Sequence, residues 1–126
     1  MAFFTGRGRQ GKLNIHFKLW IEENGQVLFG EGRQELLQAV AKNGSLAAAA
    51  RNMNMSYRAA WGRIKASEER LGFPLVERSL EGRRAVRLTA KAKKLLDRYQ
   101  DLEDQAQRLV QKVRKDFDRE LAGLRK

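Results

Sequence analysis

Hydrophobic residues near the N-terminus alternate with other residues, a pattern that predicts a β-hairpin. The alternating apolar positions are Leu13, Ile15, Phe17, Leu19 and Ile21. Their spacing of two is the period of a strand with one buried face. Asn24-Gly25 then forms a common two-residue hairpin turn, and residues 26–29 return as the second strand. His16 falls between the apolar positions, so we interpret it as an exposed side chain and not as a catalytic group.

The apolar spacing then changes to that of helices, and three short helices are expected. They cover residues 33–42, residues 46–53 and the segment that Ser56 caps and Leu71 ends. Their boundaries carry the usual stop and cap signals, which are Asn43-Gly44, Ser45, Ser56, Gly72 and Pro74. The alanine run at residues 47–50 allows the second helix to approach a neighbour closely.

Two short strands joined by a turn follow the third helix. They cover residues 75–79 and 85–88, with Gly82 in the turn. Arginines lie at the tip and just after it, which gives this hairpin the character of a basic wing. We therefore expect a mainly α fold with a small β component, a winged helix-turn-helix led by the N-terminal β-hairpin.

A long final helix begins at the cap residue Thr89, and its apolar residues recur at alternating spacings of four and three. This seam contains Leu95, Tyr99, Leu102, Ala106, Leu109, Val113 and Phe117. A helix of ~35 residues is about 50 Å long, more than a small domain covers with its own core. We therefore predict a homodimer that buries the seam. The expected organisation is a flexible basic tail over 1–12, the DNA-binding domain over 13–90 and the dimerisation helix over 91–126.

Charge is unevenly distributed along the chain. The formal net charge is +11, and residues 51–94 hold twelve basic and only four acidic side chains. A cluster of positive charge beside a helical motif is typical of phosphate contacts, so double-stranded DNA is the expected partner.

Several classes of function are disfavoured by the composition. With no cysteine and one histidine, we expect no disulfide, metal site, cofactor or cysteine nucleophile. The clustered acids are interpreted as solvated helix residues, so no catalytic residue and no enzyme activity are expected; they are Glu68, Glu69, Asp101, Glu103 and Asp104. No apolar run has the length of a membrane span or the form of a signal peptide, so we expect a cytoplasmic protein that does not enter a membrane.

The third helix divides into two faces at 100° per residue. Its apolar face contains Ala60, Ile64, Ser67 and Leu71, whereas Arg58, Gly62 and Lys65 lie roughly opposite, with Trp61 between. One core face and one basic face are what a recognition helix in the major groove requires. A glycine within a helix costs about 1 kcal/mol relative to alanine, so Gly62 indicates close approach of DNA or of another backbone.

Two parts of the chain resemble the LysR-type winged helix-turn-helix signature. They are GSLAAAARNMNMS at residues 44–56, continued by Ile64, and LGFPLVER at residues 71–78. The chain is more similar to the DNA-binding module of ModE-type molybdate-responsive regulators, through Leu19-Trp20, FGEGR at 29–33 and MSYRAAW at 55–61.

The ModE-type resemblance covers residues ~13 to ~115 and implies three features. A serine-tyrosine-basic turn opens the recognition helix, the leading hairpin packs beside that helix, and the last helix helps to dimerise the module. The chain departs from the family in its short wing tip, LEGRR at 80–84, and in ending at Lys126 without the molybdate-binding domains. We therefore expect a stand-alone module, and leave open a separate effector-sensing partner.

Ten residues are expected to contact DNA: Ser45, Ser56, Tyr57, Arg58, Trp61, Lys65, Arg78, Arg83, Arg84 and Arg87. Arg58 offers a bidentate donor to guanine, and Ser56 places cap amides near a phosphate. The wing arginines clamp the backbone, and Lys91, Lys93 and Lys94 add to the positive field. Trp61 also fits the role of a packing residue.

The predicted function is that of a sequence-specific transcription regulator that binds an inverted-repeat operator as a homodimer. A sequence-tolerant architectural protein of the nucleoid type is the main rival, because it would show the same charge and the same salt dependence. An enzyme is a weaker rival, and so is an adaptor that binds partners through the long helix alone.

Overall fold

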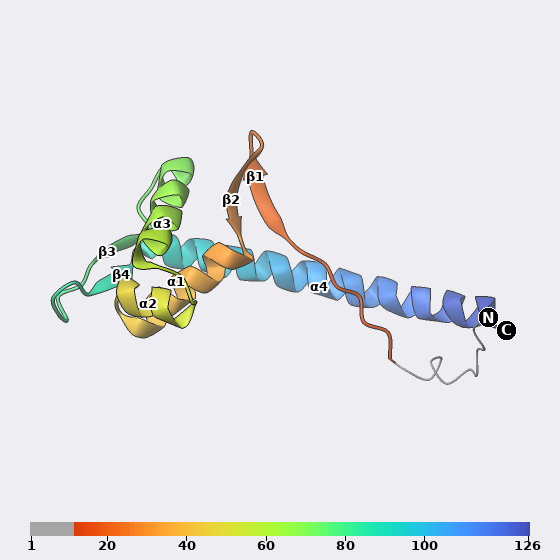
Figure 1. Ribbon diagram of the computed structural model, residues 1–126. Helices are drawn as coiled ribbons and strands as arrows, with labels where there is room; N and C mark the ends of the chain where they lie inside the picture. Colours follow the sequence, from red (N-terminus) through yellow and green to blue (C-terminus); the bar gives the residue numbers. More distant parts are fainter. Residues whose placement is uncertain (1–11) are drawn as a thin grey trace. The chain divides into compact units, whose positions relative to one another are not determined.

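The computed structural model describes residues 12–126, which contain eight elements in the order β1-β2-α1-α2-α3-β3-β4-α4 (Figure 1). Contacts divide the chain into two compact units. One is Leu19–Gln100, and the other joins the segment that ends at Lys18 to Asp101–Lys126. The mainly α fold with a small β component is confirmed. The tail expected over residues 1–12 lies, except for Lys12, outside the described residues.

The N-terminal hairpin consists of β1 (Trp20–Glu23) and β2 (Gln26–Gly30). Its turn is at Asn24 and Gly25, as predicted, and both residues have positive φ, 52° and 78°. The expected first strand from Leu13 is wrong, because residues 12–19 form no regular structure. The reason is the length of the partner: β2 pairs with four residues, from Trp20 opposite Gly30 to Glu23 opposite Gln26, and then the next helix begins.

Three helices follow: α1 (Glu31–Asn43), α2 (Leu46–Asn52) and α3 (Tyr57–Leu71). The predicted boundary signals are confirmed. Gly44 and Gly72 end α1 and α3 in the left-handed conformation, with φ of 70° and 85°. The hydroxyl oxygens of Ser45 and Ser56 accept hydrogen bonds from Ala48 N (3.1 Å) and Ala59 N (3.0 Å), the usual geometry of an N-cap.

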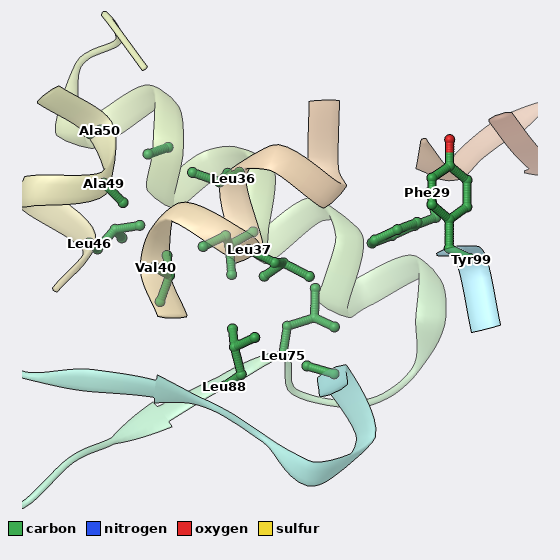
Figure 2. Close-up of a cluster of buried hydrophobic side chains, with 13 residues drawn as sticks. Phe29, Leu36, Leu37, Val40, Leu46, Ala49, Ala50, Leu75, Leu88 and Tyr99 are labelled. Carbon is green, nitrogen blue, oxygen red and sulfur yellow. The ribbon is translucent and has the colours of Figure 1, made fainter. Parts of the chain in front are cut away.

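A single cluster of buried side chains joins these elements (Figure 2). Its members are Phe29, Leu36, Leu37, Val40, Leu46, Ala49, Ala50, Ala60, Ile64, Leu75, Leu88, Ala92 and Tyr99. Ala49 and Ala50 on α2 and Ala60 on α3 are fully buried, and their small side chains let these helices pack closely. The inner face of α3 is thereby fixed against α1 and α2.

The wing is an antiparallel pair of β3 (Val76–Arg78) and β4 (Val86–Leu88). It is also joined to the turn between α1 and α2. Val86 N donates to Gly44 O at 3.0 Å, and Ala85 forms an isolated antiparallel bridge with Ser45. These bonds hold the wing beside the start of α2.

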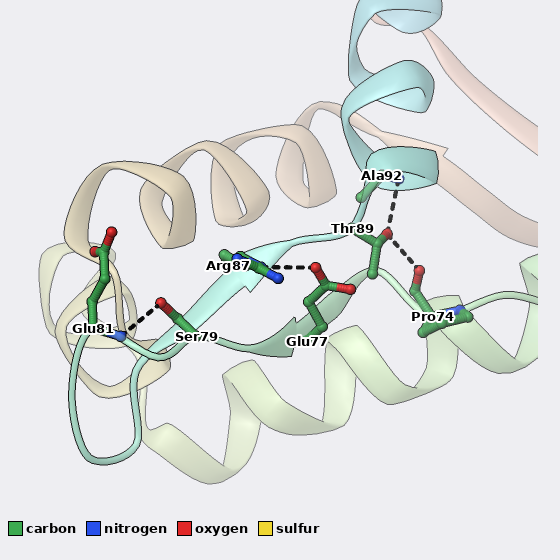
Figure 3. Close-up of polar contacts among 7 residues, drawn as sticks. All are labelled: Pro74, Glu77, Ser79, Glu81, Arg87, Thr89 and Ala92. Carbon is green, nitrogen blue, oxygen red and sulfur yellow. Dashed lines mark hydrogen bonds and ion pairs between the residues drawn. The ribbon is translucent and has the colours of Figure 1, made fainter.

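The last helix, α4 (Ala90–Leu124), has 35 residues, as the apolar spacing predicted. Thr89 caps it by accepting from Ala92 N at 3.1 Å, and the same hydroxyl donates to Pro74 O at 2.8 Å (Figure 3). One side chain thus joins the start of α4 to the segment that leads into the wing. Among the described helices, none combines the length and the apolar character that crossing a bilayer demands.

Tyr99 corrects the predicted seam of α4. Its ring is 1% exposed within the single chain and packs edge-on against Phe29, with centroids 5.0 Å apart. Its hydroxyl donates to Leu19 O at 2.7 Å. Tyr99 therefore belongs to the core and is not available to a partner, and Leu95 is half-buried against the same core. Four of the remaining apolar seam residues are exposed: Leu102, Leu109, Val113 and Phe117.

Replacing Tyr99 with phenylalanine should lower the free energy of unfolding by about 1 kcal/mol, because the ring packing stays and the bond to Leu19 O is lost. Urea denaturation followed by circular dichroism measures this. The matched control is Tyr57→Phe, which removes an exposed hydroxyl and should change stability by less than about 0.5 kcal/mol. Equal effects of the two substitutions would contradict the role of the Tyr99 hydroxyl.

Candidate nucleic-acid interface

The predicted division of α3 into two faces is confirmed. Ala60, Ile64 and Ser67 are buried against the core. The outward face is exposed to solvent and consists of Tyr57, Arg58, Trp61, Gly62 and Lys65. Packing therefore fixes the helix by one side and leaves a polar and aromatic side free.

The N-terminal turn of α3 presents two of the predicted contact residues. Tyr57 is 56% exposed, although it is a large aromatic residue. Arg58 follows it and is exposed, and it has no hydrogen bond or ion pair within residues 12–126. The preceding turn is tight: Asn54 has φ 55°, and Met55 N donates to Ala50 O at 3.0 Å. This arrangement leaves a guanidinium free to bind an external acceptor.

Farther along α3, Trp61 and Lys65 interact with each other. The Lys65 Nζ lies 4.4 Å from the centroid of the Trp61 ring and 3.2 Å from Glu68 Oε1. The other oxygen of Glu68 accepts Leu75 N at 2.7 Å, at the start of the wing segment. Glu68 thus has a structural role, and the positive charge of Lys65 is partly balanced. Trp61 is 41% exposed, so its ring both packs and remains accessible.

The wing carries four arginines in two different states. Arg78, Arg83 and Arg84 are exposed and have no polar partner in the described part of the chain. Arg87 instead pairs with Glu77 across the two strands, with Nε 2.8 Å from Oε2 (Figure 3). Three free guanidiniums therefore remain on the wing, and Arg87 is a weaker candidate for a phosphate contact than the sequence indicated.

Four of the ten predicted DNA-contact residues lie around a hollow of about 330 Å³ between α2, α3 and the wing; they are Ser45, Tyr57, Trp61 and Arg84. It is lined by Ser45, Leu46, Ala47, Tyr57, Trp61, Val76, Arg84 and Val86. Its four aliphatic residues were not predicted from the sequence, because their meeting depends on the bonds between the wing and the α1–α2 turn. No local signal in the sequence could have identified them.

A second group of cations was also missed. Arg33 Nε donates to the buried Ser67 Oγ at 2.9 Å, and Arg70 donates to Val27 O at 3.0 Å. Burial lowers the pKa of Arg33 below its ordinary value, and the nearby charges of Arg63 and Arg70 lower it further. Arginine still remains cationic in proteins, so this flank of α3 is positive as well. No group of metal-ligating side chains occurs within residues 12–126.

Comparison with known proteins gives a family for this arrangement. Residues 33–93 match the family described as bacterial regulatory helix-turn-helix protein, lysR family. The chain is similar to the protein in the crystal structure of a CbnR_DBD–DNA complex, with 32% identity, 68% of this chain and 97% of that chain covered, and a TM-score of 0.52. It is also similar to CbnR, a LysR family transcriptional regulator. The identity is 33%, the match covers 67% of this chain and 28% of the CbnR chain, and the TM-score is 0.50.

A curated relative is the molybdenum-pterin-binding protein MopB of Rhodobacter capsulatus. It is 32% identical over 91 residues, which are 71% of this chain and 34% of that protein. The chain thus spans about a third of the length of this relative.

Gly62 lies in the outward face of α3, and a Cβ added there would meet no protein atom within 4 Å. Packing within the described chain therefore does not require a glycine. We expect Gly62→Ala to raise the free energy of unfolding by up to about 1 kcal/mol, because alanine is the better helix former. The same substitution should weaken binding of duplex DNA if the outward face of α3 enters the major groove as we expect, since the added methyl group projects from that face.

Urea denaturation and fluorescence anisotropy with labelled duplex would measure the two effects. Gly123→Ala is the control, because a Cβ at this position of α4 also meets nothing. It should leave DNA affinity unchanged. If Gly62→Ala also keeps full affinity, close approach of DNA at Gly62 is wrong.

Proposed function

This chain belongs to the lysR family of bacterial regulatory helix-turn-helix proteins, and from this premise we propose that it is a sequence-specific DNA-binding transcription regulator. The observation that carries the proposal is the outward face of α3. There Arg58 and the exposed Tyr57 lie beside a wing with three exposed arginines, and within residues 12–126 neither Arg58 nor these three arginines have a polar partner. Such a face suits the major groove, and the wing suits the adjacent phosphates.

Each contact has a chemical basis. Arg58 can donate two parallel hydrogen bonds to O6 and N7 of guanine, the commonest specific contact in the major groove. Ser56 caps α3, so the first amides of this helix and its positive dipole end suit a phosphate. The free wing arginines supply charge that neutralises the backbone without reading sequence. The similarity to CbnR_DBD, which was crystallised with DNA, supports this proposal.

We further propose that two copies of the chain pair through α4. Leu102, Leu109, Val113 and Phe117 are between 41% and 62% exposed and recur at spacings of seven and four. Pairing of these seams around a two-fold axis buries them and sets two recognition helices at a fixed separation. The operator is then an inverted repeat whose half-sites lie one or more helical turns apart, about 34 Å each. Such a regulator acts in the cytoplasm, where the DNA is.

The net charge of +11 equally favours an architectural protein that binds DNA of any sequence. We propose sequence-specific binding because the outward face of α3 carries groups that can read base edges. No catalytic role is proposed, since Glu68, one of the candidate acids, is already bound to the wing segment and to Lys65.

The Arg58→Ala substitution tests sequence reading. It should cost roughly 1–3 kcal/mol on the cognate operator and reduce discrimination at one base pair. The operator is first selected from random duplexes, and affinities for it and for a scrambled duplex are then measured by anisotropy at one salt concentration. Arg98→Ala, which removes an exposed cation on α4, is the control. Equal losses on both duplexes would reduce Arg58 to a phosphate contact and favour an architectural protein.

Dimerisation is tested by replacing Leu102 and Leu109 together with glutamate. Sedimentation at micromolar concentration should give twice the 14.5 kDa chain mass for the unchanged protein and the chain mass for the double variant. The double variant should also bind the operator more weakly, because a monomer contacts only one half-site and one half-site competes poorly with non-specific DNA. Gln107→Glu adds a carboxylate on another face of α4 and should remain dimeric. A 14.5 kDa species for the unchanged protein would contradict the dimer.

A further inference from the structure

The hollow between α2, α3 and the wing has the character of a small-molecule site. We propose that it binds a small planar aromatic carboxylate and that this ligand competes with duplex DNA. The competition, but not the binding itself, rests on the proposed function.

The hollow has a suitable size and fixed walls. Its volume of about 330 Å³ lies in the range of about 300–1,000 Å³ that small-molecule sites occupy. Val86 on one wall is tied to Gly44 by a 3.0 Å bond, and Ser45 on another is bridged to Ala85 and caps α2. The site is therefore formed before a ligand arrives, which reduces the entropic cost of binding.

The lining selects an aromatic ligand. Leu46, Ala47, Val76 and Val86 supply an aliphatic surface. The rings of Tyr57 and Trp61 add two aromatic surfaces that are 56% and 41% exposed. A flat ring covers such surfaces well, and aromatic pairs gain energy beyond the area that they bury.

The polar groups of the lining select a single negative charge. Arg84 is the one charged residue of the lining, and it has no ion pair in the part of the chain that the structure describes. The oxygen of Ser45 accepts Ala48 N, which leaves its O–H free to donate. A guanidinium and a hydroxyl can satisfy one carboxylate. Because Arg84 is the one cation of the lining, the hollow balances one negative charge and leaves the second charge of a doubly charged oxyanion uncompensated beside apolar walls.

Ligand and DNA would compete because they use the same residues. Tyr57, Trp61 and Arg84 line the hollow and are also among the residues that we assign to DNA contact. A ligand that occupies them lowers DNA affinity, and DNA must lower ligand affinity by the same factor.

The probe for the test is 2-naphthoate, added to the ¹⁵N-labelled full chain and followed by NMR. The two tryptophans give two indole N–H signals, and Trp20→Phe assigns them. Trp61 lines the hollow and Trp20 does not, so the Trp61 signal should shift saturably while the Trp20 signal stays. The neutral 2-naphthamide should bind at least about ten-fold more weakly.

Two variants locate the site. Arg84→Gln should weaken 2-naphthoate at least about ten-fold, and the neighbouring Arg83→Gln, which removes a charge outside the lining, less than about two-fold. Ala47→Leu fills the hollow and should abolish the shift of Trp61. An unmoved Trp61 signal at millimolar 2-naphthoate, or equal weakening by Arg84→Gln and Arg83→Gln, overturns the proposal.

Competition is measured by adding 2-naphthoate to the complex with labelled duplex, with 2-naphthamide as the control. Naphthoate should raise the apparent Kd for DNA in proportion to its occupancy. A protein that binds naphthoate at Trp61 but binds no duplex would retain the site and refute the proposed regulator. A protein that binds duplex but not naphthoate would support the proposed regulator and refute the small-molecule site. Equal naphthoate binding with and without saturating DNA would refute the competition.

Discussion

The position of the wing beside α3 depends on two consecutive residues, Gly44 and Ser45. Gly44 ends α1 at φ 70°, a conformation that costs other residues roughly 1 kcal/mol or more, and its carbonyl oxygen accepts Val86 N from the wing. Ser45 caps α2 and bridges to Ala85. A single turn therefore sets the direction of α2, and through it the packing of α3, and also anchors the strand that carries the wing. Moving this turn would separate the two surfaces that together form the candidate interface.

The charged side chains divide according to whether the fold uses them. Glu68 holds the segment that leads into the wing by accepting Leu75 N, and the Arg87–Glu77 pair spans the two wing strands. Both groups are already satisfied, and an exposed ion pair of this kind contributes little more than local order. Arg58 and Arg84 have no such partner within residues 12–126. Arg58 lies on the outward face of α3, and Arg84 lines the apolar hollow beside it. The fold thus leaves unpaired charge where an external anion is expected.

Local signals in the sequence were sufficient for the helices and insufficient for the contacts between distant segments. The caps Ser45, Ser56 and Thr89 act within three residues of their own position, so short-range spacing predicts them. The strand expected from Leu13 failed because an alternating pattern reports half-burial and does not show how long the partner strand is. The hollow could not be predicted at all, since its walls come from three separate segments. The assignment of the ten DNA-contact residues remains a prediction.

Tyr99 shows why a regular apolar seam does not identify its partner. A heptad-like pattern is the same whether an apolar residue faces its own core or a second chain, and only the tertiary structure separates the two. On α4 the change from buried to exposed apolar residues lies near Gln100. Tyr99 is buried against Phe29, whereas Leu102 is 41% exposed and Leu109 is 62% exposed. The first part of the helix therefore stabilises the DNA-binding unit, and the later part leaves the apolar side chains of the proposed dimer seam exposed. Because different residues carry the two roles, we expect substitutions along the later part to change the strength of the proposed dimer without weakening the core that positions α3.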